Sequence, residues 1–491
     1  MDNFYGKNSK HFITFVAKDQ KTNIMFKKEV YTQRRDILRE KMNSGLVLLP
    51  GNPESPMNAP GNTFHFRQDS SFLYYFGLDF PDIIGIIDID KNRDYLFADD
   101  VDIDDIIWMG PQETLKEVGA KVGVENTSTF SEAAGVLSEA ISKGRKIHFL
   151  PQYRAENVIL MEKLLGIHPS RIPEYVSEEL IKTVVDQRSA KDHYEIEELD
   201  KAANIGYQMH ITAMRMAKPE VYEREIAGRI EGIALSNGGM LSFPVILTVN
   251  GQTLHNHYHG NLMKEGDLML TDAGAETPMH YASDFTRTIP VGGKFTPEQK
   301  DIYNIVLHAN NRAFKHIKPG VTYKEIHLIA AATIVEGLKE LGIMKGDPNE
   351  AVQQGAHALF MPHGLGHMMG LDVHDMEAIG EDYVGYDDEV KRSSVFGIGG
   401  LRMGRKLQPN FVITNEPGLY FIPELIDRWK AEKKFTEFIN YDKLEEYRNF
   451  GGIRLEDDIL ITQDGCRLLG DKRLPITVEE VEAEMNKDPE F

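Results

Sequence analysis

The residues best suited to chemistry lie in one short segment, 361–375, with the sequence MPHGLGHMMGLDVHD. It carries His363, His367 and His374 in a stretch that also contains three glycines. A helix would place His363 and His367 on one face, as in some zinc sites, but the two glycines between them disfavour a helix. The segment therefore predicts a loop that bends closely around a bound group. The alternative is a glycine-rich loop whose histidines are purely structural.

Four acidic residues end predicted strands or follow them closely. They are Asp272 after LMLT, Asp284 after a turn-forming stretch, Glu416 after FVITN, and Glu456 after GGIRL. Burying four carboxylates is prohibitively costly unless cations compensate their charge. Two divalent ions carry the matching positive charge, and His367 adds one neutral nitrogen ligand. These five residues together predict a two-metal site, although any one acid alone would more often be a turn or capping residue.

The ligand types also bear on the metal and the reaction. Oxygen ligands with one imidazole favour Mn²⁺, while Co²⁺, Zn²⁺ and Fe²⁺ remain open. Two ions that share a water lower its pKa towards neutrality, which predicts a hydrolase. The sequence has no G-x-S-x-G, P-loop or H-E-x-x-H motif, and Cys466 lies in the turn-like QDGCR. A second metal cluster on the alternating histidines of HNHYH, 255–259, is a further alternative, because on a strand they would share one face.

An α/β region precedes these motifs. In residues 1–185, short apolar runs that predict strands alternate with amphipathic stretches that predict helices. The segment 65–82 (HFRQDSSFLYYFGLDFPD) is rich in aromatic residues with charges interleaved, which predicts either a sheet edge or interface, or part of the core. The strands are expected at 46–49, 83–89, 95–97 and 147–150, and the helices near 112–121, 130–143 and 154–166.

The polar, aperiodic segment 186–194 (DQRSAKDHY) predicts a domain boundary. The expected order beyond it is helices, strands, helices, the histidine loop and strands again. KEGDLMLTD and LQPNFVITNE are weakly similar strands that each end in an acid, through a true internal repeat or by chance. We therefore expect an α/β (α+β) chain with a mixed-sheet N-terminal domain, 1–185, and a C-terminal domain, 186–491.

Composition limits the partners. The 491 residues include 55 basic and 76 acidic side chains, a formal charge of −21 that disfavours nucleic acid or an anionic membrane as the main partner. A single cysteine, Cys466, excludes an intramolecular disulfide and is typical of a reducing compartment. The start of the chain has no apolar signal-peptide core, and no run of about 18 apolar residues occurs. We expect a cytoplasmic protein.

At these motifs the sequence resembles the pita-bread metallopeptidases, the family of methionine aminopeptidase, aminopeptidase P and prolidase. The motifs DAGAETPMHYASDFTRT, MPHGLGHMMGLDVHD, NEPGLYF and GGIRLEDD occur in the family's order. Residues 1–185 resemble the creatinase-type N-terminal domain, and residues 186–491 the pita-bread catalytic domain. The resemblance assigns metal ligands to Asp272, Asp284, His367, Glu416 and Glu456.

The resemblance also implies roles for other residues. It assigns substrate binding to His255, His363 and His374, and it places Arg454 beside the last ligand. His374 would support the oxyanion, Glu416 would handle the proton, and Arg454 with Thr286 would orient ligand carboxylates. A homodimer is also implied.

Within the family, prolidases resemble the chain more than aminopeptidase P does, through the long segment between the two glutamates. The expected function is a dinuclear-metal exopeptidase that hydrolyses the Xaa-Pro bond of dipeptides, with Arg402 receiving the free carboxylate. The alternatives are an aminopeptidase P acting on longer peptides with proline second, metal-free creatinase-type chemistry, and a catalytically dead binding protein. Two departures from the family are a slightly longer step from Asp272 to Asp284 and an insertion around residues 381–400.

Overall fold

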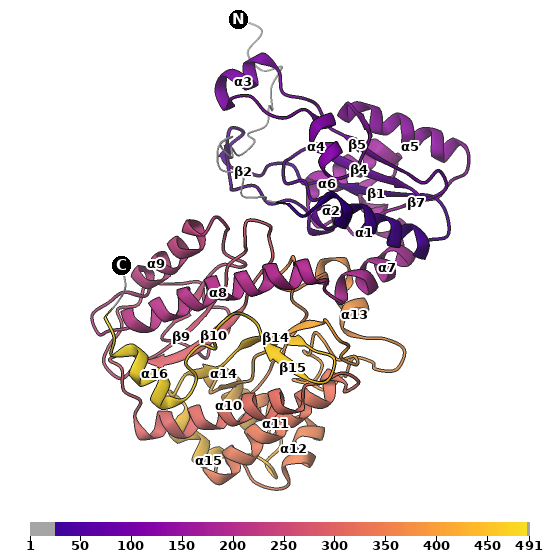
Figure 1. The fold of residues 1–491 in the computed structure, drawn as a ribbon. Coiled ribbons are helices and arrows are strands. Elements are labelled where there is room, and N and C mark those ends of the chain that lie inside the picture. Colours follow the sequence, from indigo (N-terminus) through magenta and orange to yellow (C-terminus); the bar gives the residue numbers. More distant parts are fainter. Residues whose placement is uncertain (1–24, 489–491) are drawn as a thin grey trace, which may run out of the picture. The chain divides into compact units, whose positions relative to one another are not determined.

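The computed structural model describes residues 25–488 and divides the chain into two compact units (Figure 1). The first unit ends at Arg188 and includes Ala378–Gly380, and the second comprises Ser189–Glu377 and the residues from Glu381 on. The sequence-based division after residue 185 and this division both lie near the end of α7 (Glu178–Ser189). The start of the chain, on which the expectation of no signal peptide rests, lies outside the described residues.

The N-terminal unit is built on a mixed five-stranded sheet with the order β6-β5-β4-β1-β7. Neighbours β1–β4 and β4–β5 are antiparallel, whereas β1–β7 and β5–β6 are parallel. The sheet strands are β1 (Leu46–Pro50), β4 (Ile84–Asp88), β5 (Arg93–Phe97), β6 (Asn126–Ser128) and β7 (Ile147–His148), and a separate hairpin holds β2 (Pro56–Ala59) and β3 (Asn62–Thr63). The remaining elements are α1 (Lys28–Lys41), α2 (Ser70–Phe76), α3 (Ile103–Met109), α4 (Leu115–Lys121), η1 (Phe130–Glu132), α5 (Ala133–Ser142), α6 (Ala155–Leu165) and η2 (Pro169–Tyr175).

The aromatic segment 65–82 is not a sheet edge, because its centre forms the helix α2. Asp69 caps this helix by accepting a hydrogen bond from the backbone N–H of Phe72, and Gly77 ends it in the left-handed conformation with φ 63°. Every residue of α2 is buried. The alternative expectation, that this segment belongs to the core, therefore holds.

The second unit contains two helix pairs, each packed on strands. Helix α8 (His193–Met216) pairs with α9 (Glu223–Ser236) and contacts β9 and β10, whereas α10 (Pro297–His316) pairs with α11 (Tyr323–Glu340) and contacts β11–β13. In Figure 1, α8 crosses above the strands and α10 and α11 lie below them. Asp192, Thr296 and Thr322 form capping boxes at the starts of α8, α10 and α11. The expected order of helices and strands is confirmed.

The strands of this unit form three small sheets, in the orders β10-β9-β8, β11-β14-β15 and β12-β13. They are β8 (Ile246–Thr248), β9 (Leu268–Ala273), β10 (Phe285–Pro290), β11 (Val412–Asn415), β12 (Gly418–Tyr420), β13 (Gly452–Arg454), β14 (Asp457–Ile461) and β15 (Cys466–Leu468). The remaining helices are α12 (Pro348–Gln354), η3 (Ala356–Leu359), α13 (Glu377–Gly385), α14 (Pro423–Ala431), α15 (Tyr441–Leu444), η4 (Glu445–Tyr447) and α16 (Val478–Met485).

Isolated bridges join the sheets at the points that matter for the site. Asp272 on β9 pairs with Thr286 on β10, and Thr286 forms a bridge with Glu456. A second bridge joins Met368 of the histidine loop to Ile413 of β11. Residues that are far apart in the sequence are thereby held side by side.

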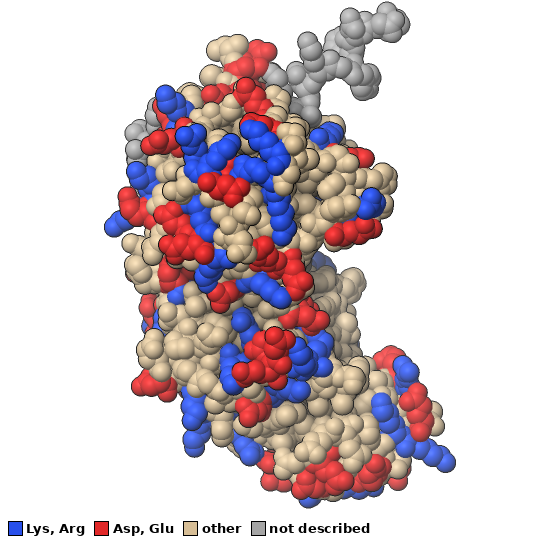
Figure 2. Space-filling view, turned by 90° about the vertical axis from the view of Figure 1, so that its right-hand side faces the viewer, with Lys and Arg blue, Asp and Glu red and all other residues tan. Residues whose placement is uncertain are grey.

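The surface mixes both signs of charge. On the face shown in Figure 2, basic and acidic side chains are interspersed. Ion pairs at the surface include Arg448–Asp427, with a 2.6 Å N–O distance. None of the helices in residues 25–488 combines the length and apolar character needed to cross a membrane.

Candidate metal centre

The histidine loop runs against β11 as though it were another strand. The backbone N–H of His367 donates to Thr414 Oγ1 at 3.1 Å, and the N–H of Thr414 donates to the carbonyl of His367 at 3.0 Å. A Cβ atom on Gly366 would lie 2.2 Å from the carbonyl oxygen of Thr414. Glycine is therefore required for this close approach, as the predicted bending of the loop implied.

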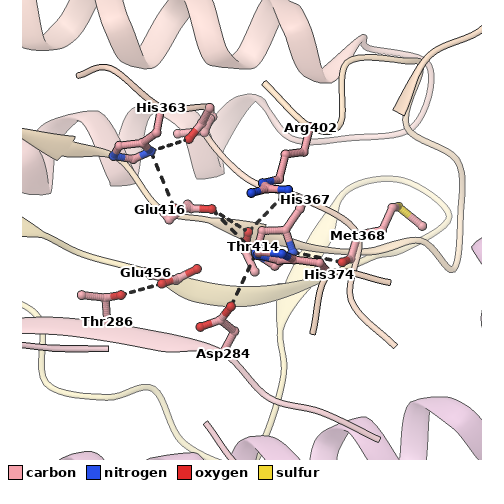
Figure 3. A network of polar contacts seen from close by, with 12 residues as sticks. Asp284, Thr286, His363, His367, Met368, His374, Arg402, Thr414, Glu416 and Glu456 are labelled. Atoms are coloured by element: carbon pink, nitrogen blue, oxygen red, sulfur yellow. Dashed lines mark hydrogen bonds and ion pairs between the residues drawn. The ribbon is translucent and has the colours of Figure 1, made fainter. Parts of the chain in front are cut away.

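Three of the five predicted ligands form a tight group. Asp284, His367 and Glu456 are all buried, and each offers a ligand atom within 4.8 Å of the others. Figure 3 shows their side chains pointing toward one another from the residue just before β10, the histidine loop and the residue just before β14. The Nε2 atom of His367 lies 3.4 Å from Asp284 Oδ2 and 3.8 Å from Glu416 Oε1. Glu416 therefore lies beside this group.

Asp272 is the predicted ligand that forms an ion pair with Arg454. Its Oδ2 atom accepts a 2.6 Å hydrogen bond from Arg454 Nη2. Its Oδ1 atom is buried and has no hydrogen-bond partner among residues 25–488, and the same is true of Asp284 Oδ1. Buried carboxylate oxygens normally find a partner. The two unpartnered oxygens are thus suitable ligands for a divalent cation.

The carboxylates oppose one another's ionisation. The pKa values of Asp284 and Glu456 are raised well above the ordinary range, first by burial and then by neighbouring acids. Burial also raises the pKa of Glu416 to about 8, partly offset by Arg454. Burial lowers the pKa of His367 to about 4, so this ring is neutral and able to bind a metal at neutral pH. A cation in the group would remove the cost of ionising these acids.

Arg454 connects the carboxylates through a network that includes one residue the sequence did not single out. Its Nε atom donates to Thr286 Oγ1 at 3.1 Å, and Thr286 donates to Glu456 Oε2 at 2.5 Å. Its Nη1 atom donates to the hydroxyl of Tyr420 at 2.8 Å. Tyr420 lies in the NEPGLYF motif. The hydroxyl of Tyr420 in an otherwise apolar strand was the one sequence feature that could have indicated a role in the site.

The two flanking histidines have different surroundings. His363 is bound through Nε2 to the hydroxyl of Tyr420 at 3.0 Å and through Nδ1 to the carbonyl of Gly364 at 2.7 Å. The ring centroid of His374 lies 4.3 Å from that of His367, and burial lowers the pKa of His374 to about 2. Burial lowers the pKa of His363 to about 3, so both histidines are neutral beside the carboxylates.

A buried ion pair supports the loop that carries His374. Lys191 Nζ lies 2.6 Å from Asp375 Oδ2, and each side chain is 1% exposed. The backbone N–H of Asp375 also donates to the carbonyl of Met368 at 3.0 Å. Both contacts hold the residue next to His374 in place.

His255 is an exposed residue at the edge of the site. Partial desolvation lowers its pKa, and Arg454 lowers it further. The alternative of a metal cluster on HNHYH is wrong, because residues 255–259 do not form a strand. The Nδ1 atoms of His257 and His259 instead face the carbonyls of Val245 and Leu247, at 3.3 and 3.0 Å.

Arg402 lies beside His367 and His374 (Figure 3). Its Nη1 atom pairs with Glu377 Oε2 and lies 3.3 Å from Glu381 Oε2. The arginine thus lies next to two histidines of the predicted site, and its role in binding substrate stays a prediction. The acidic partners were not foreseen.

A mixed α/β fold with a buried group of carboxylates and histidine defines a metallohydrolase. The chain belongs to metallopeptidase family M24, whose profile, described as "Metallopeptidase family M24", matches residues 197–463. A second profile, "Aminopeptidase P, N-terminal domain", matches residues 31–148. The resemblance seen in the motifs and the expected pita-bread fold of the catalytic domain are thus confirmed, and the chain is an enzyme of this family.

Relatives carry two related names. The chain is 33% identical over 451 residues to "Xaa-Pro dipeptidase" of Homo sapiens, covering 89% of this chain and 88% of that protein. It is 32% identical to "Probable Xaa-Pro aminopeptidase PEPP" of Uncinocarpus reesii, covering 89% of each. The solved structure of Pseudomonas aeruginosa aminopeptidase PepP matches with a TM-score of 0.77 and 28% identity, covering 94% of this chain and 98% of that one.

Proposed function

We propose that this chain is a dinuclear-metal exopeptidase that hydrolyses the bond before proline, with Xaa-Pro dipeptides as its preferred substrates. The observation that carries the proposal is the position of Arg402 beside a buried group of carboxylates and histidines. A guanidinium there can receive the free carboxylate of a dipeptide while the peptide bond lies at the carboxylates. The names of the relatives support the preference for proline.

The proposed ligands of the two metal ions are Asp272, Asp284, His367, Glu416 and Glu456. The unpartnered oxygens of Asp272 and Asp284 and the mutual repulsion of the acids support this assignment. Oxygen ligands with one imidazole favour Mn²⁺, and Co²⁺, Zn²⁺ and Fe²⁺ are the alternatives. When bound, such ions supply an activated water and polarise the scissile carbonyl.

The protein's own groups supply proton transfer and orientation. Glu416 is the proposed proton carrier, because its carboxylate lies beside His367 at the edge of the group that would hold the metal ions and the water. His374 would donate a hydrogen bond to the oxygen of the attacked carbonyl. His363 and His255 would hold the substrate, and Arg454 would keep Asp272 and Thr286 oriented.

The experiment that tests the dipeptide preference compares Arg402→Ala with the wild-type enzyme. Metal-depleted protein would be reconstituted with Mn²⁺ and assayed on Ala-Pro, Ala-Pro amide and Ala-Pro-Ala. We expect kcat/KM on Ala-Pro to fall. The loss of transition-state stabilisation should be about 1.5 to 3 kcal/mol, the range for hydrogen bonds to charged groups. The loss on the amide and the tripeptide should be much smaller. Equal losses on Ala-Pro and its amide would reject carboxylate recognition by Arg402.

A second candidate, an aminopeptidase P acting on longer peptides, is favoured by a specific observation. Nη1 of Arg402 already pairs with two carboxylates, which reduces the gain from binding a third. In that case the tripeptide Ala-Pro-Ala should be the better substrate of the wild-type enzyme in the same assay.

We further infer a cytoplasmic homodimer. A single cysteine is typical of a reducing compartment, and the resemblance to the family supports a dimer. Light scattering on the purified protein and fractionation of the source cells would test the two statements separately.

A further inference from the structure

Arg402 is held at one of its three nitrogens. Nη1 pairs with both Glu377 and Glu381, whereas Nε and Nη2 make no hydrogen bond to any residue in the described part of the chain. The side chain is 37% exposed. One edge of the guanidinium, formed by Nε and Nη2, is thus left for an external partner. Two parallel donors on this edge match the two oxygens of a carboxylate.

The insertion around residues 381–400 holds Glu381, the second partner of Arg402, in place. Arg392 pairs with the second oxygen of Glu381, and its Nε atom donates to Asp382 Oδ1 at 2.7 Å. Its Nη1 atom donates to the carbonyls of Gly399 and Leu401 at 3.0 and 3.1 Å. Arg392 therefore ties the beginning of the insertion to its end, immediately before Arg402.

Further contacts stiffen the same segment. The guanidinium carbon of Arg392 lies 4.7 Å from the ring centroid of Tyr386, and the hydroxyl of Tyr386 donates to the carbonyl of Leu401 at 2.6 Å. The carbonyl of Leu401 thus accepts hydrogen bonds from both side chains. The insertion is a closed structure rather than a free loop.

Glu377 approaches Arg402 from the side of the metal centre. Its Oε2 atom lies 3.7 Å from His374 Nδ1, and its side chain is only 12% exposed. The same oxygen pairs with Arg402 Nη1. Glu377 therefore links the position of the arginine to that of the histidine proposed to act on the scissile carbonyl.

We propose that Glu377 and the insertion at residues 381–400 form a specificity element, in which Glu377 and Glu381 grip Nη1 of Arg402 and present its Nε–Nη2 edge to the terminal carboxylate of a dipeptide. This inference rests on the proposed dipeptidase function. A free arginine side chain loses rotamer entropy when it binds a ligand, so holding it in place in advance strengthens carboxylate binding. Glu377 and Glu381 are positioning residues, since neither needs to touch the substrate.

The test uses the Mn²⁺-reconstituted full-length enzyme and the variants Glu377→Gln, Glu381→Gln and Arg402→Met. We expect each glutamine variant to raise KM for Ala-Pro by about 3- to 10-fold, as for coupled neighbouring residues. KM for Ala-Pro amide should change less than about twofold on the same grounds. In the Arg402→Met background, either glutamine substitution should have no further effect on Ala-Pro.

The matched control is Glu389→Gln. Glu389 belongs to the same insertion but pairs with the exposed Lys406, at 2.5 Å. The substitution Glu389→Gln should therefore leave both KM values unchanged. Thermal unfolding and metal content identify any variant that has lost its fold. If Glu377→Gln loses its fold or its metal because its contact with His374 is lost, the test is made with Glu381→Gln only.

The outcomes separate the two proposals. One set of outcomes overturns only the positioning role. In it, Arg402→Met raises KM for Ala-Pro more than KM for the amide. The glutamine variants, however, change both KM values equally, behave like Glu389→Gln, or raise KM further in the Arg402→Met background. Equal effects of Arg402→Met itself on the two substrates would reject the dipeptidase proposal, and the specificity element with it.

Discussion

Arg454 donates a 2.8 Å hydrogen bond from Nη1 to the hydroxyl oxygen of Tyr420. An arginine has no acceptor, so the tyrosine proton is directed to its other partner, His363 Nε2, at 3.0 Å. The Nδ1–H of His363 then donates to the carbonyl of Gly364. Burial raises the pKa of Tyr420 to about 12 and lowers that of His363 to about 3, so both side chains stay neutral. The network therefore selects one tautomer of His363.

Removing the hydroxyl in Tyr420→Phe should lower kcat/KM by about 10- to 100-fold, as for other residues that orient a metal site. Both Arg454 Nη1 and His363 Nε2 would lose a buried partner. Steady-state kinetics with metal analysis checks this. Tyr303→Phe, which removes another buried hydroxyl bound to the carbonyl of Ile476, is the control and should keep its activity. A loss below threefold in Tyr420→Phe would exclude the hydroxyl from the mechanism.

Asp284→Ala should abolish activity and reduce the bound metal to fewer than two ions per chain. It removes a proposed ligand and leaves Glu456 and His367 without the third member of their group. Elemental analysis after dialysis measures the metal directly. Asp427→Ala deletes an exposed carboxylate paired with Arg448 and should retain full metal content. Two ions and near-normal turnover in Asp284→Ala would show that the ligand assignment is wrong.

His374→Ala should keep the metal ions but lose turnover. Loss of one oxyanion donor costs about 10²- to 10³-fold in kcat. The comparison is made with His316→Ala, an exposed histidine that bonds to the carbonyl of Arg312 on the same helix. A drop smaller than threefold would remove His374 from the mechanism, and loss of metal would instead point to a ligand role.

Glu377 should make stability depend on pH. Burial raises its pKa from 4.5 to about 7, an effect that Arg402 partly offsets and Glu381 increases. The folded-state pKa of this carboxyl lies above the unfolded one. Its favourable contribution to the free energy of unfolding is therefore fully present below about pH 4.5 and is lost as the pH rises towards 7. Besides Arg402 and Glu381, the charged or titratable groups facing it are His374 and Arg392.

Glu377→Gln cannot ionise and so lacks this dependence. The melting temperature of the variant relative to wild type should therefore rise between about pH 5 and about pH 8. Thermal unfolding of the two metal-free proteins in matched buffers measures the difference. A constant difference across this range would mean that Glu377 does not titrate there.

Sequence reasoning found the residues whose chemistry is unusual for their position. Carboxylates at strand ends are costly in any fold, so Asp272, Asp284 and Glu456 could be grouped without coordinates. Tyr420 was missed because its value depends on Arg454, 34 residues away on the paired strand β13, and no local pattern reports that distance.

Other errors came from assigning the wrong local structure. An alternating pattern suggested a strand at HNHYH, but backbone carbonyls of neighbouring residues hold two of its rings in a loop. The aromatic segment around α2 combined apolar and polar residues, and tertiary burial selected a short helix. Glu377 could not be recognised as a partner of Arg402, because the insertion that brings them together has its own hydrogen bonds.

The bridge between Thr286 and Glu456 joins residues 170 positions apart. During synthesis, a growing chain that has not reached Glu456 cannot complete the carboxylate group, however well its earlier helices have formed. Contacts of such long separation close late, after local elements have folded. A chain that ends before Glu456 would therefore lack one of the proposed metal ligands, and we expect it to be unable to cut peptides.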